Sequence, residues 1–275
     1  MNPVLKWVGG KRQLLNKIKE LMPKEYDCYY EPFIGGGALL FDIEPKRAVI
    51  NDMNSELVNV YKVLSNKNEY VKLISKLDEH QFNHSKEYYY SIRELDRSDD
   101  YKLLPKHEKA ARIIYLNKAG YNGLYRVNSK GYYNVPFGQK EKVNLYSKEN
   151  IDEVNKFFCN NDIKIVNVDF EEAVSEAKKG DFVYFDPPYD NLDNKESFTS
   201  YTKDSFTRED QIRLFNTFEI LSKLGVKVML SNHYTEFIKE LYKDYKIKVV
   251  SAKRLVNSNS NGRGDVLEVI ITNYD

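Results

Sequence analysis

The 275-residue sequence contains only two cysteines, no long apolar run and almost no net charge. Cys28 and Cys159 belong to no Cys-x-x-Cys pair or histidine-rich cluster, which argues against structural zinc and indicates two reduced, buried thiols. No apolar run approaches the roughly 20 residues that a membrane-spanning helix needs. Met1 to Gly10 also lacks the apolar core of a signal peptide. We therefore expect a cytoplasmic protein without a bound metal and without a membrane contact.

The net charge is +1, so no global basic excess indicates a nucleic-acid partner, but the charges are unevenly distributed. Tyr101 to Lys142 contains nine Lys or Arg and two acidic residues, a local excess of seven positive charges. Such a run can be a merely solvated surface. Here it is interleaved with tyrosines, whose rings can stack on bases while the cations pair with phosphates. The tyrosines are Tyr115, Tyr121, Tyr125, Tyr132 and Tyr133. The segment therefore predicts contact with nucleic acid.

The first 55 residues predict the start of a doubly wound α/β sheet. Apolar residues at helical spacing predict a helix over Lys11 to Leu21, and Asp27 to Glu31 predicts a strand. A glycine-rich turn follows, then a helix from Ala38 and a second strand over Arg47 to Asn51. The order strand, turn, helix, strand is typical of the first βαβ unit of such a sheet.

The pattern then becomes helical from about Ser55 to Asn117. Gly120 to Lys142 is rich in Gly, Asn and Tyr, and Asn128 to Gly131 predicts a hairpin turn. The strand and helix patterns that follow are Ile163 to Val168, Asp181 to Phe185, helical Arg208 to Leu224, Val226 to Ser231, and an edge hairpin of Tyr245 to Leu255 with Val266 to Thr272. We expect an α/β domain of residues 1–55 and 145–275, interrupted by a helical domain of residues 56–144.

Asp186-Pro187-Pro188-Tyr189 is the most informative segment, because it follows a run that predicts a buried strand. Two consecutive prolines end regular structure. A carboxylate, a rigid carbonyl and an aromatic ring thus come to the carboxyl end of a strand, where open α/β sheets bind ligands. Two acceptors beside a stacking ring suit a planar substrate that bears an amino group. The alternative is an ordinary proline-rich turn.

The glycine-rich turn and Asp52 predict a nucleoside site. Glycines Gly35 to Gly37 permit close approach of a ligand to the backbone, and Asp52 ends the next strand 17 residues after Gly35. An acid at this place in a Rossmann-like sheet accepts ribose hydroxyls. Asp52 could also cap the following helix. No Gly-Lys-Ser/Thr follows the glycines, so the turn is not a P-loop.

Two further strand ends carry candidate residues. Asp169 and Phe170 follow a strand and could contact an adenine ring, or form a turn with a core phenylalanine. Ser231-Asn232-His233 ends another strand and borders the expected site, without a catalytic role assigned to it. Scattered histidines elsewhere indicate neither a metal nor catalysis.

Six ordered motifs, spanning nearly the whole chain, resemble the DNA adenine-N6 methyltransferases of the Dam family. They are Lys6-Trp7-Val8-Gly9-Gly10-Lys11, Pro32-Phe33-Ile34-Gly35-Gly36, Asn51-Asp52-Met53-Asn54, Asn122-Gly123-Leu124-Tyr125-Arg126, Asn134-Val135-Pro136-Phe137-Gly138 and Asp186-Pro187-Pro188-Tyr189. The order of glycine motif, recognition insertion and Asp-Pro-Pro-Tyr is that of the α group of amino methyltransferases. The resemblance implies a Rossmann-like S-adenosylmethionine-dependent methyltransferase sheet with an inserted, mostly helical DNA-recognition domain that carries a β-hairpin.

The resemblance also implies roles for individual residues. The catalytic segment is Asp186, Pro187, Pro188 and Tyr189. The residues implied to bind S-adenosylmethionine are Trp7, Lys11, Pro32, Phe33, Gly35, Gly37, Asp52, Asp169, Phe170 and Asp186. The residues implied to meet double-stranded DNA are Lys6, Tyr121, Asn122, Leu124, Arg126, Asn128, Pro136 and Arg254. No metal is implied.

The implied reaction is methyl transfer to the N6 amino group of an adenine flipped out of DNA, with GATC as the family's target. Arg126 is the candidate for reading a guanine, or else contacts a phosphate. The acceptors at Asp186 and Pro187 would equally suit cytosine, and only the resemblance favours adenine. The competing interpretations are an RNA or protein-amide methyltransferase and a non-catalytic DNA-binding module. A bacterial, archaeal or phage origin is implied, with or without a cognate restriction endonuclease.

Overall fold

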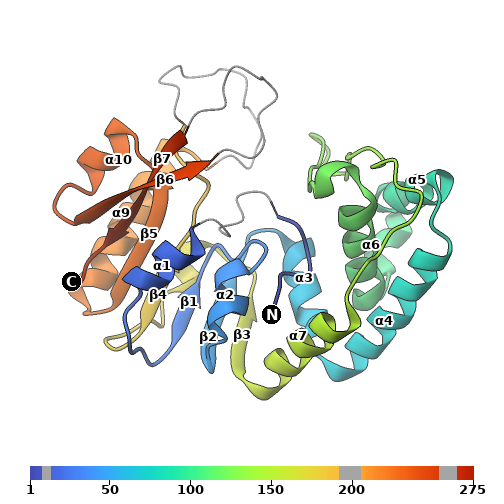
Figure 1. Cartoon of the computed structure of the whole chain (residues 1–275), viewed down its shortest axis with the longest axis horizontal. Coiled ribbons are helices and arrows are strands. Elements are labelled where there is room, and N and C mark those ends of the chain that lie inside the picture. Colours follow the sequence, from blue (N-terminus) through green and yellow to red (C-terminus); the bar gives the residue numbers. More distant parts are fainter. Residues whose placement is uncertain (8–13, 192–205, 254–264) are drawn as a thin grey trace. The chain divides into compact units, whose positions relative to one another are not determined.

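The computed structural model describes residues 1–7, 14–191, 206–253 and 265–275 (Figure 1). Two of the implied site residues, Lys11 and Arg254, lie outside these ranges. The chain forms two compact units. Unit 1 comprises Met1–Lys11, Ile34–Lys46 and Asn51–Asn167, and unit 2 comprises Arg12–Phe33, Arg47–Ile50 and Val168–Asp275.

The elements alternate in the manner of an α/β protein. The helices are α1 (Leu15–Leu21), α2 (Ala38–Ile43), α3 (Ser55–Leu64), α4 (Lys67–Phe82), α5 (Lys86–Glu94), α6 (Lys106–Ala119), α7 (Lys148–Asn160), α8 (Phe170–Ala173), α9 (Arg208–Lys223) and α10 (Glu236–Leu241), with 3-10 turns η1 (Leu95–Arg97), η2 (Asp99–Leu103) and η3 (Tyr121–Gly123). The strands are β1 (Tyr29–Glu31), β2 (Arg47–Asn51), β3 (Asp162–Val166), β4 (Phe182–Phe185), β5 (Lys227–His233), β6 (Lys246–Lys253) and β7 (Asp265–Thr272).

The seven strands form one sheet in the order β3-β2-β1-β4-β5-β7-β6, which confirms the predicted α/β class. β1 pairs in parallel with β2 and β4, and β4 pairs in parallel with β5. β7 is antiparallel to both β5 and β6, so the predicted terminal hairpin adds the antiparallel edge of the sheet. Parallel strands align their carboxyl ends, which brings the end of β4 beside the end of β5.

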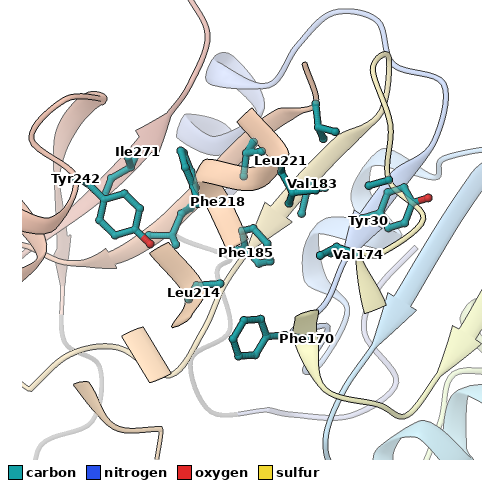
Figure 2. Close-up of a cluster of buried hydrophobic side chains, with 14 of the residues drawn as sticks. Tyr30, Phe170, Val174, Val183, Phe185, Leu214, Phe218, Leu221, Tyr242 and Ile271 are labelled. Carbon is teal, nitrogen blue, oxygen red and sulfur yellow. The ribbon is translucent and has the colours of Figure 1, made fainter. Parts of the chain in front are cut away.

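The core of unit 2 lies between the sheet and α9. Every residue of β4 is buried, as expected for a central parallel strand covered on both faces. Figure 2 shows Phe185 of β4, Phe218 of α9 and Tyr242 directed into one apolar cluster. Each fully buried side chain of this size contributes about 1.5–3 kcal/mol to folding. α9 begins with a reciprocal capping box between Thr207 and Asp210, which fixes the start of the helix.

Unit 1 contains helices α3 to α7. α6 packs against α3, α4 and α5, and nearly all of its side chains from Ala110 to Ala119 are buried. The helical pattern from Ser55 to Asn117 predicted helices in this region, but α7 was not predicted. Ser147 caps α7, and its apolar residues Ile151, Val154 and Phe158 are spaced to pack on one face.

The predicted hairpin at Gly120 to Lys142 is not confirmed. Its turn is present, since the side-chain oxygen of Asn128 accepts from the backbone N–H groups of Lys130 and Tyr132. The flanking residues form no named strand, and only the isolated bridges Val127–Tyr133 and Gly120–Phe137 occur. Backbone bonds join Asn128 to Tyr132 and Asn134 to Arg126, but the Tyr133 backbone N–H donates to the Asp96 side chain instead.

Within the described ranges, no helix is long and apolar enough to cross a membrane. The same part of the chain brings no three His, Cys, Asp or Glu side chains together as a metal site.

Candidate active site

The Asp186-Pro187-Pro188-Tyr189 segment leaves β4 where the sequence predicted. The Asp186 carboxylate accepts a hydrogen bond of 2.8 Å from the Ser231 hydroxyl of β5. The Tyr189 hydroxyl donates to Glu268 of β7 at 3.0 Å, and the Tyr189 ring meets the His233 ring edge to face. Burial, with the negative charge of Asp186 second, holds the pKa of Tyr189 well above its usual value, so its hydroxyl remains a donor. Strands β5 and β7 thus orient both ends of the segment.

A buried polar network fixes the backbone immediately after this segment. The Pro188 carbonyl accepts from Gln211 of α9, whose side-chain oxygen accepts from Asn232. Asn232 in turn accepts from the Asp190 backbone N–H at 2.9 Å. The Asp190 carboxylate accepts from Arg208 and Thr235. Since buried polar groups are costly when unpaired, this network favours one backbone path past Tyr189.

In unit 1, the Asp52 carboxylate is joined to the glycine turn by a backbone hydrogen bond. The Asp52 carboxylate accepts from the backbone N–H groups of Gly35 at 3.0 Å and Asn54 at 2.9 Å. Burial raises the pKa of Asp52, and these two bonds oppose that shift. The cap of α3 is Asn54, whose side chain accepts from Leu57, so Asp52 is not the helix cap.

The turn needs glycine for two separate reasons. Gly35 and Gly37 have φ values of +49° and +72°, in the left-handed region. A Cβ on Gly35 would also lie 3.0 Å from the indole of Trp7. Trp7 packs over this turn and stacks on Tyr125 at a centroid distance of 5.1 Å.

Phe33, Asp169 and Phe170 belong to unit 2. Phe170 is 3% exposed and packs against Phe33 and Phe206, which matches the alternative of a core phenylalanine. Asp169 caps α8 and pairs with Arg213 at 2.9 Å, while 42% of its side chain stays exposed. Asp169 therefore offers an accessible carboxylate, whereas the Phe170 ring is buried.

Lys6 lies against the segment from Gly120 to Gly138, which we call the 120–138 loop. Asn117 of α6 binds the Lys6 backbone N–H and carbonyl, and also the Gly123 carbonyl, at 2.8–2.9 Å. A Cβ on Gly123 would lie 2.6 Å from the Lys6 side chain. Asn117 is buried and thereby joins residues more than a hundred positions apart in the sequence.

The predicted DNA-binding residues of this loop have different environments. Tyr121 is 53% exposed, and Asn122, which is also exposed, has a φ of +53° that Asn tolerates. Arg126 is exposed, and its Nε donates to the Asn134 side chain at 2.6 Å. Pro136 is exposed and Leu124 is half-buried. The Asn128 side-chain oxygen already holds the turn.

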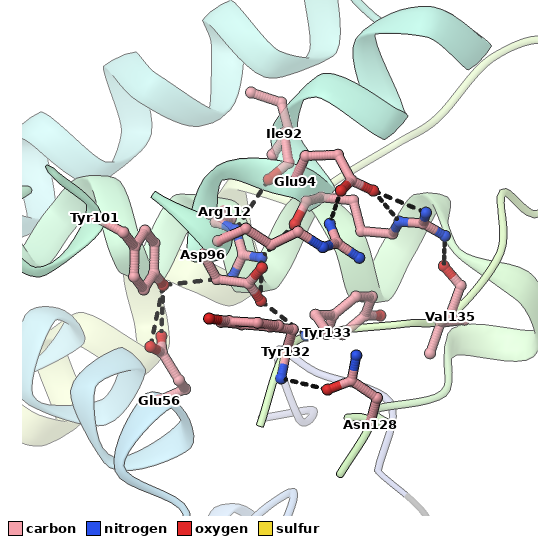
Figure 3. Close-up of polar contacts among 12 residues, drawn as sticks. Glu56, Ile92, Glu94, Asp96, Tyr101, Arg112, Asn128, Tyr132, Tyr133 and Val135 are labelled. Atoms are coloured by element: carbon pink, nitrogen blue, oxygen red, sulfur yellow. Dashed lines mark hydrogen bonds and ion pairs between the residues drawn. The ribbon is translucent and has the colours of Figure 1, made fainter. Parts of the chain in front are cut away.

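Part of the basic segment from Tyr101 to Lys142, which was predicted to contact nucleic acid, is buried. Arg112 is 2% exposed and pairs with Asp96 at 2.8 Å, while donating to the carbonyls of Ile92 and Arg93 (Figure 3). Tyr115 and Tyr133 are buried as well. Among the tyrosines of this segment, Tyr121 presents the most accessible ring for stacking.

Three residues of these sites were not predicted: Asn117, Gln211 and Glu268. Ser231 was expected at the border of the site as a polar residue ending an apolar strand, but without a role. The others act through partners far away in the sequence and left no local pattern.

A seven-stranded α/β sheet of this kind is consistent with a methyltransferase fold. Residues 7–256 match the family described as D12 class N6 adenine-specific DNA methyltransferase. A Type II methyltransferase, M1.LlaDCHI of Lactococcus lactis subsp. cremoris, is 48% identical over 100% of this chain and 96% of its own length. Type II methyltransferase M.MjaIII of Methanocaldococcus jannaschii is 41% identical over 100% of this chain and 99% of its own length. DNA adenine methylase of Escherichia coli K12 is 34% identical over 97% of this chain and 93% of its own length.

The chain therefore belongs to the D12 class of N6 adenine-specific DNA methyltransferases, and it is an enzyme that methylates adenine in DNA. The resemblance stated from the six motifs is confirmed. The family implies S-adenosylmethionine as methyl donor and DNA as substrate.

Proposed function

We propose that the enzyme transfers a methyl group from S-adenosylmethionine to the N6 amino group of an adenine turned out of double-stranded DNA at GATC. The observation that carries this proposal is the Asp186-Pro187-Pro188-Tyr189 segment at the end of β4. Its carboxylate is bonded to Ser231 and its ring is oriented by Glu268. Two fixed acceptors beside a fixed ring suit one planar amino-bearing base.

The fit of unit 1 to the cofactor supports this proposal. A left-handed glycine turn lets a ligand approach the backbone closely, and a Cβ at Gly35 would fill the space beside Trp7. The Asp52 carboxylate is held by two backbone bonds in an orientation suited to ribose hydroxyls. When bound, S-adenosylmethionine supplies an electrophilic methyl group on a sulfonium sulfur.

The proposed cofactor contacts include Lys11, which lies outside the described residues. The other proposed contacts are Trp7, Pro32, Phe33, Gly35, Gly37, Asp52, Asp169, Phe170 and Asp186. The exposed carboxylate of Asp169 is suited to the amino group of the cofactor's adenine, and Phe170 supports it from the core.

The chain's own contribution to the chemistry lies in its hydrogen-bond acceptors. The amino lone pair of adenine is delocalised into the ring, which makes the nitrogen a poor nucleophile. The Asp186 carboxylate and the Pro187 carbonyl accept its two N–H bonds, which favours a pyramidal nitrogen with a localised lone pair. The methylated nitrogen is cationic and loses its proton without a strong base. Orientation and fixed electrostatics therefore supply much of the rate.

An adenine within a duplex cannot reach this segment, so the base must leave the stack and rest on Tyr189. Lys6 and the 120–138 loop are the proposed DNA-contacting elements, with residues 56–144 as the recognition domain. Tyr121 would fill or support the vacated stack, since its ring is half exposed. Arg126 would read a guanine. The remaining proposed contacts are Asn122, Leu124, Asn128, Pro136 and Arg254.

The biological role would be either modification beside a cognate restriction endonuclease or methylation without one. One relative is named a Type II methyltransferase and another a DNA adenine methylase, and each aligns along nearly the whole chain.

The test is Asp186→Ala, for which we expect no methyl transfer while DNA affinity stays within about tenfold of wild type. Asp244→Ala removes an exposed carboxylate of the same unit and should behave as wild type. Normal turnover by Asp186→Ala would contradict the proposed mechanism. Methyl transfer and DNA binding are measured separately on the same duplex.

A further inference from the structure

The end of β5 carries two polar side chains that are completely buried, Ser231 and Asn232. Buried polar groups in folded proteins have partners, and those partners indicate why the polar residue is there. Asn232 serves the network around Asp190. Ser231 has a different partner, because β4 and β5 run in parallel with Phe185 opposite Leu230. The next residues along the two strands are Asp186 and Ser231.

The donor and the acceptor of each hydrogen bond around Ser231 can be assigned. Its hydroxyl lies 2.8 Å from Asp186 Oδ1 and 2.9 Å from the Tyr184 hydroxyl. An ionised carboxylate only accepts, so Ser231 donates its single proton to Asp186. The Tyr184 hydroxyl must then donate to Ser231. Burial, with Asp186 second, holds the pKa of Tyr184 well above its usual value, so this phenol keeps its proton.

We propose that Ser231 is a positioning residue for methyl transfer, which orients the Asp186 carboxylate and keeps it ionised, and that Tyr184 fixes the direction of the Ser231 proton. This inference rests on the proposed function, in which Asp186 accepts the adenine amino group. A carboxylate that rotates freely would align its oxygen with the amino group only part of the time. In this role Ser231 acts through the Asp186 carboxylate.

Titratable groups surround the two phenols on which the Asp186 charge acts, Tyr184 of β4 and Tyr189. Glu268 of β7 acts on both phenols, Glu31 of β1 acts on Tyr184, and the His233 ring of β5 meets the Tyr189 ring. Glu31 and Glu268 act electrostatically on the same Tyr184 phenol as Asp186 does. Nearby negative charge opposes ionisation of a carboxylate, whereas a donated hydrogen bond favours it. The donated Ser231 bond therefore favours the ionised form of Asp186.

The experiment compares Ser231→Ala, Ser231→Thr and Tyr184→Phe in the full chain. The single-turnover methylation rate is measured from pH 5 to 9, together with the dissociation constants for DNA and S-adenosylmethionine. Ser231→Ala should slow methylation about 10- to 100-fold, the effect of losing one hydrogen bond to a charged group. Both dissociation constants should stay within about threefold. The acid limb of its rate profile should move to higher pH, because Asp186 loses a bond that favours its charged form.

Ser231→Thr keeps the hydroxyl and should restore both the rate and the acid limb to near wild type. Tyr184→Phe should move the acid limb in the same direction as Ser231→Ala, but by less. An unmoved acid limb in Ser231→Ala, or a loss that appears only in the dissociation constants, would overturn the inference. Equal losses in the Ala and Thr variants would also overturn it. Activity retained by Asp186→Ala would instead refute the proposed function, so the two failures are distinguishable.

Discussion

Arg126 is an exposed cation whose guanidinium is oriented by a neighbouring side chain. Its Nε donates to the Asn134 side chain and its Nη2 lies 3.3 Å from the Asn134 carbonyl. A guanidinium held on one side can present its remaining donors in a fixed direction, which suits the two acceptors of a guanine edge.

We predict that Arg126→Ala relaxes the sequence preference at one base of the target by about 1–3 kcal/mol. The preference is measured as kcat/KM on duplexes that differ from GATC at single positions. Lys130→Ala, on the exposed turn of the same loop, is the matched control and should weaken all duplexes alike. A uniform loss for Arg126→Ala as well would make Arg126 a phosphate contact.

At the residue level, local motifs carried most of the predictive information. The prolines after Phe185 restrict the backbone, and the glycines from Gly35 to Gly37 permit left-handed conformations, so turns at these strand ends could be predicted. Arg112 was counted among surface cations, because a sequence does not show that Asp96 lies beside it in the interior. Ser231 could not be linked to Asp186, 45 residues away, without the strand register.

α6 carries the buried charge that organises unit 1 near the 120–138 loop. Arg112 pairs with Asp96, and Asp96 also accepts from the Tyr133 backbone N–H at 2.7 Å. Tyr101 joins Arg112 to Glu56, as the dashed lines in Figure 3 show. Removing one member of such a pair leaves its partner charged and buried.

We predict that Arg112→Met lowers the free energy of unfolding by about 3–5 kcal/mol, because the Asp96 carboxylate loses its counter-charge. The double variant Arg112→Met/Asp96→Leu should lose less than the two single variants together. Arg97→Met removes a more exposed ion pair and should cost about 1 kcal/mol or less. These values come from urea unfolding, and equal losses for Arg112→Met and Arg97→Met would contradict the assignment.

His80 of α4 makes the helices of unit 1 sensitive to acid. Burial lowers its pKa to about 4, and its ring stacks on Tyr115 and bonds to the Tyr88 hydroxyl. Unfolded chains take up the proton near the ordinary value of about 6.5. The neutral ring therefore stabilises the fold fully above that pH, and the contribution is lost as pH falls toward 4.

We predict that wild type loses on the order of 2–3 kcal/mol more unfolding free energy than His80→Gln as pH falls from 6.5 to 4.5. Other groups titrate in this range, so the difference between the two proteins isolates His80. His107→Gln, which removes a histidine paired with Glu69, should retain the His80 effect. Identical pH dependence of wild type and His80→Gln would contradict this account.

Helices and strands with strong periodic patterns were predicted well, as β2 and α9 illustrate. The 120–138 loop was not, because its pairing is limited to isolated bridges and the Tyr133 backbone N–H donates to Asp96 instead of a partner strand. Turn chemistry near Asn128 is local and was predicted. The partners of Tyr133 are 37 residues away for its backbone and 9 for its hydroxyl, and they depend on how α5, η1 and α6 pack.

At the scale of the whole molecule, the order of motifs was more informative than any single motif. Two acceptors and a ring at the end of β4 suit either adenine or cytosine. The family match along residues 7–256 decides for adenine. The target sequence depends instead on side chains that meet DNA, and those contacts follow from no pattern within the chain.

The most direct test uses labelled S-adenosylmethionine with duplexes that contain GATC or a single-base change of it, followed by identification of the methylated base. The account predicts N6-methyladenine within GATC and a large loss of transfer on every altered duplex. Equal transfer to duplexes without GATC would contradict the proposed target. A label recovered on cytosine, or only on RNA or protein, would contradict the assignment of Asp186 to Tyr189 as the adenine site.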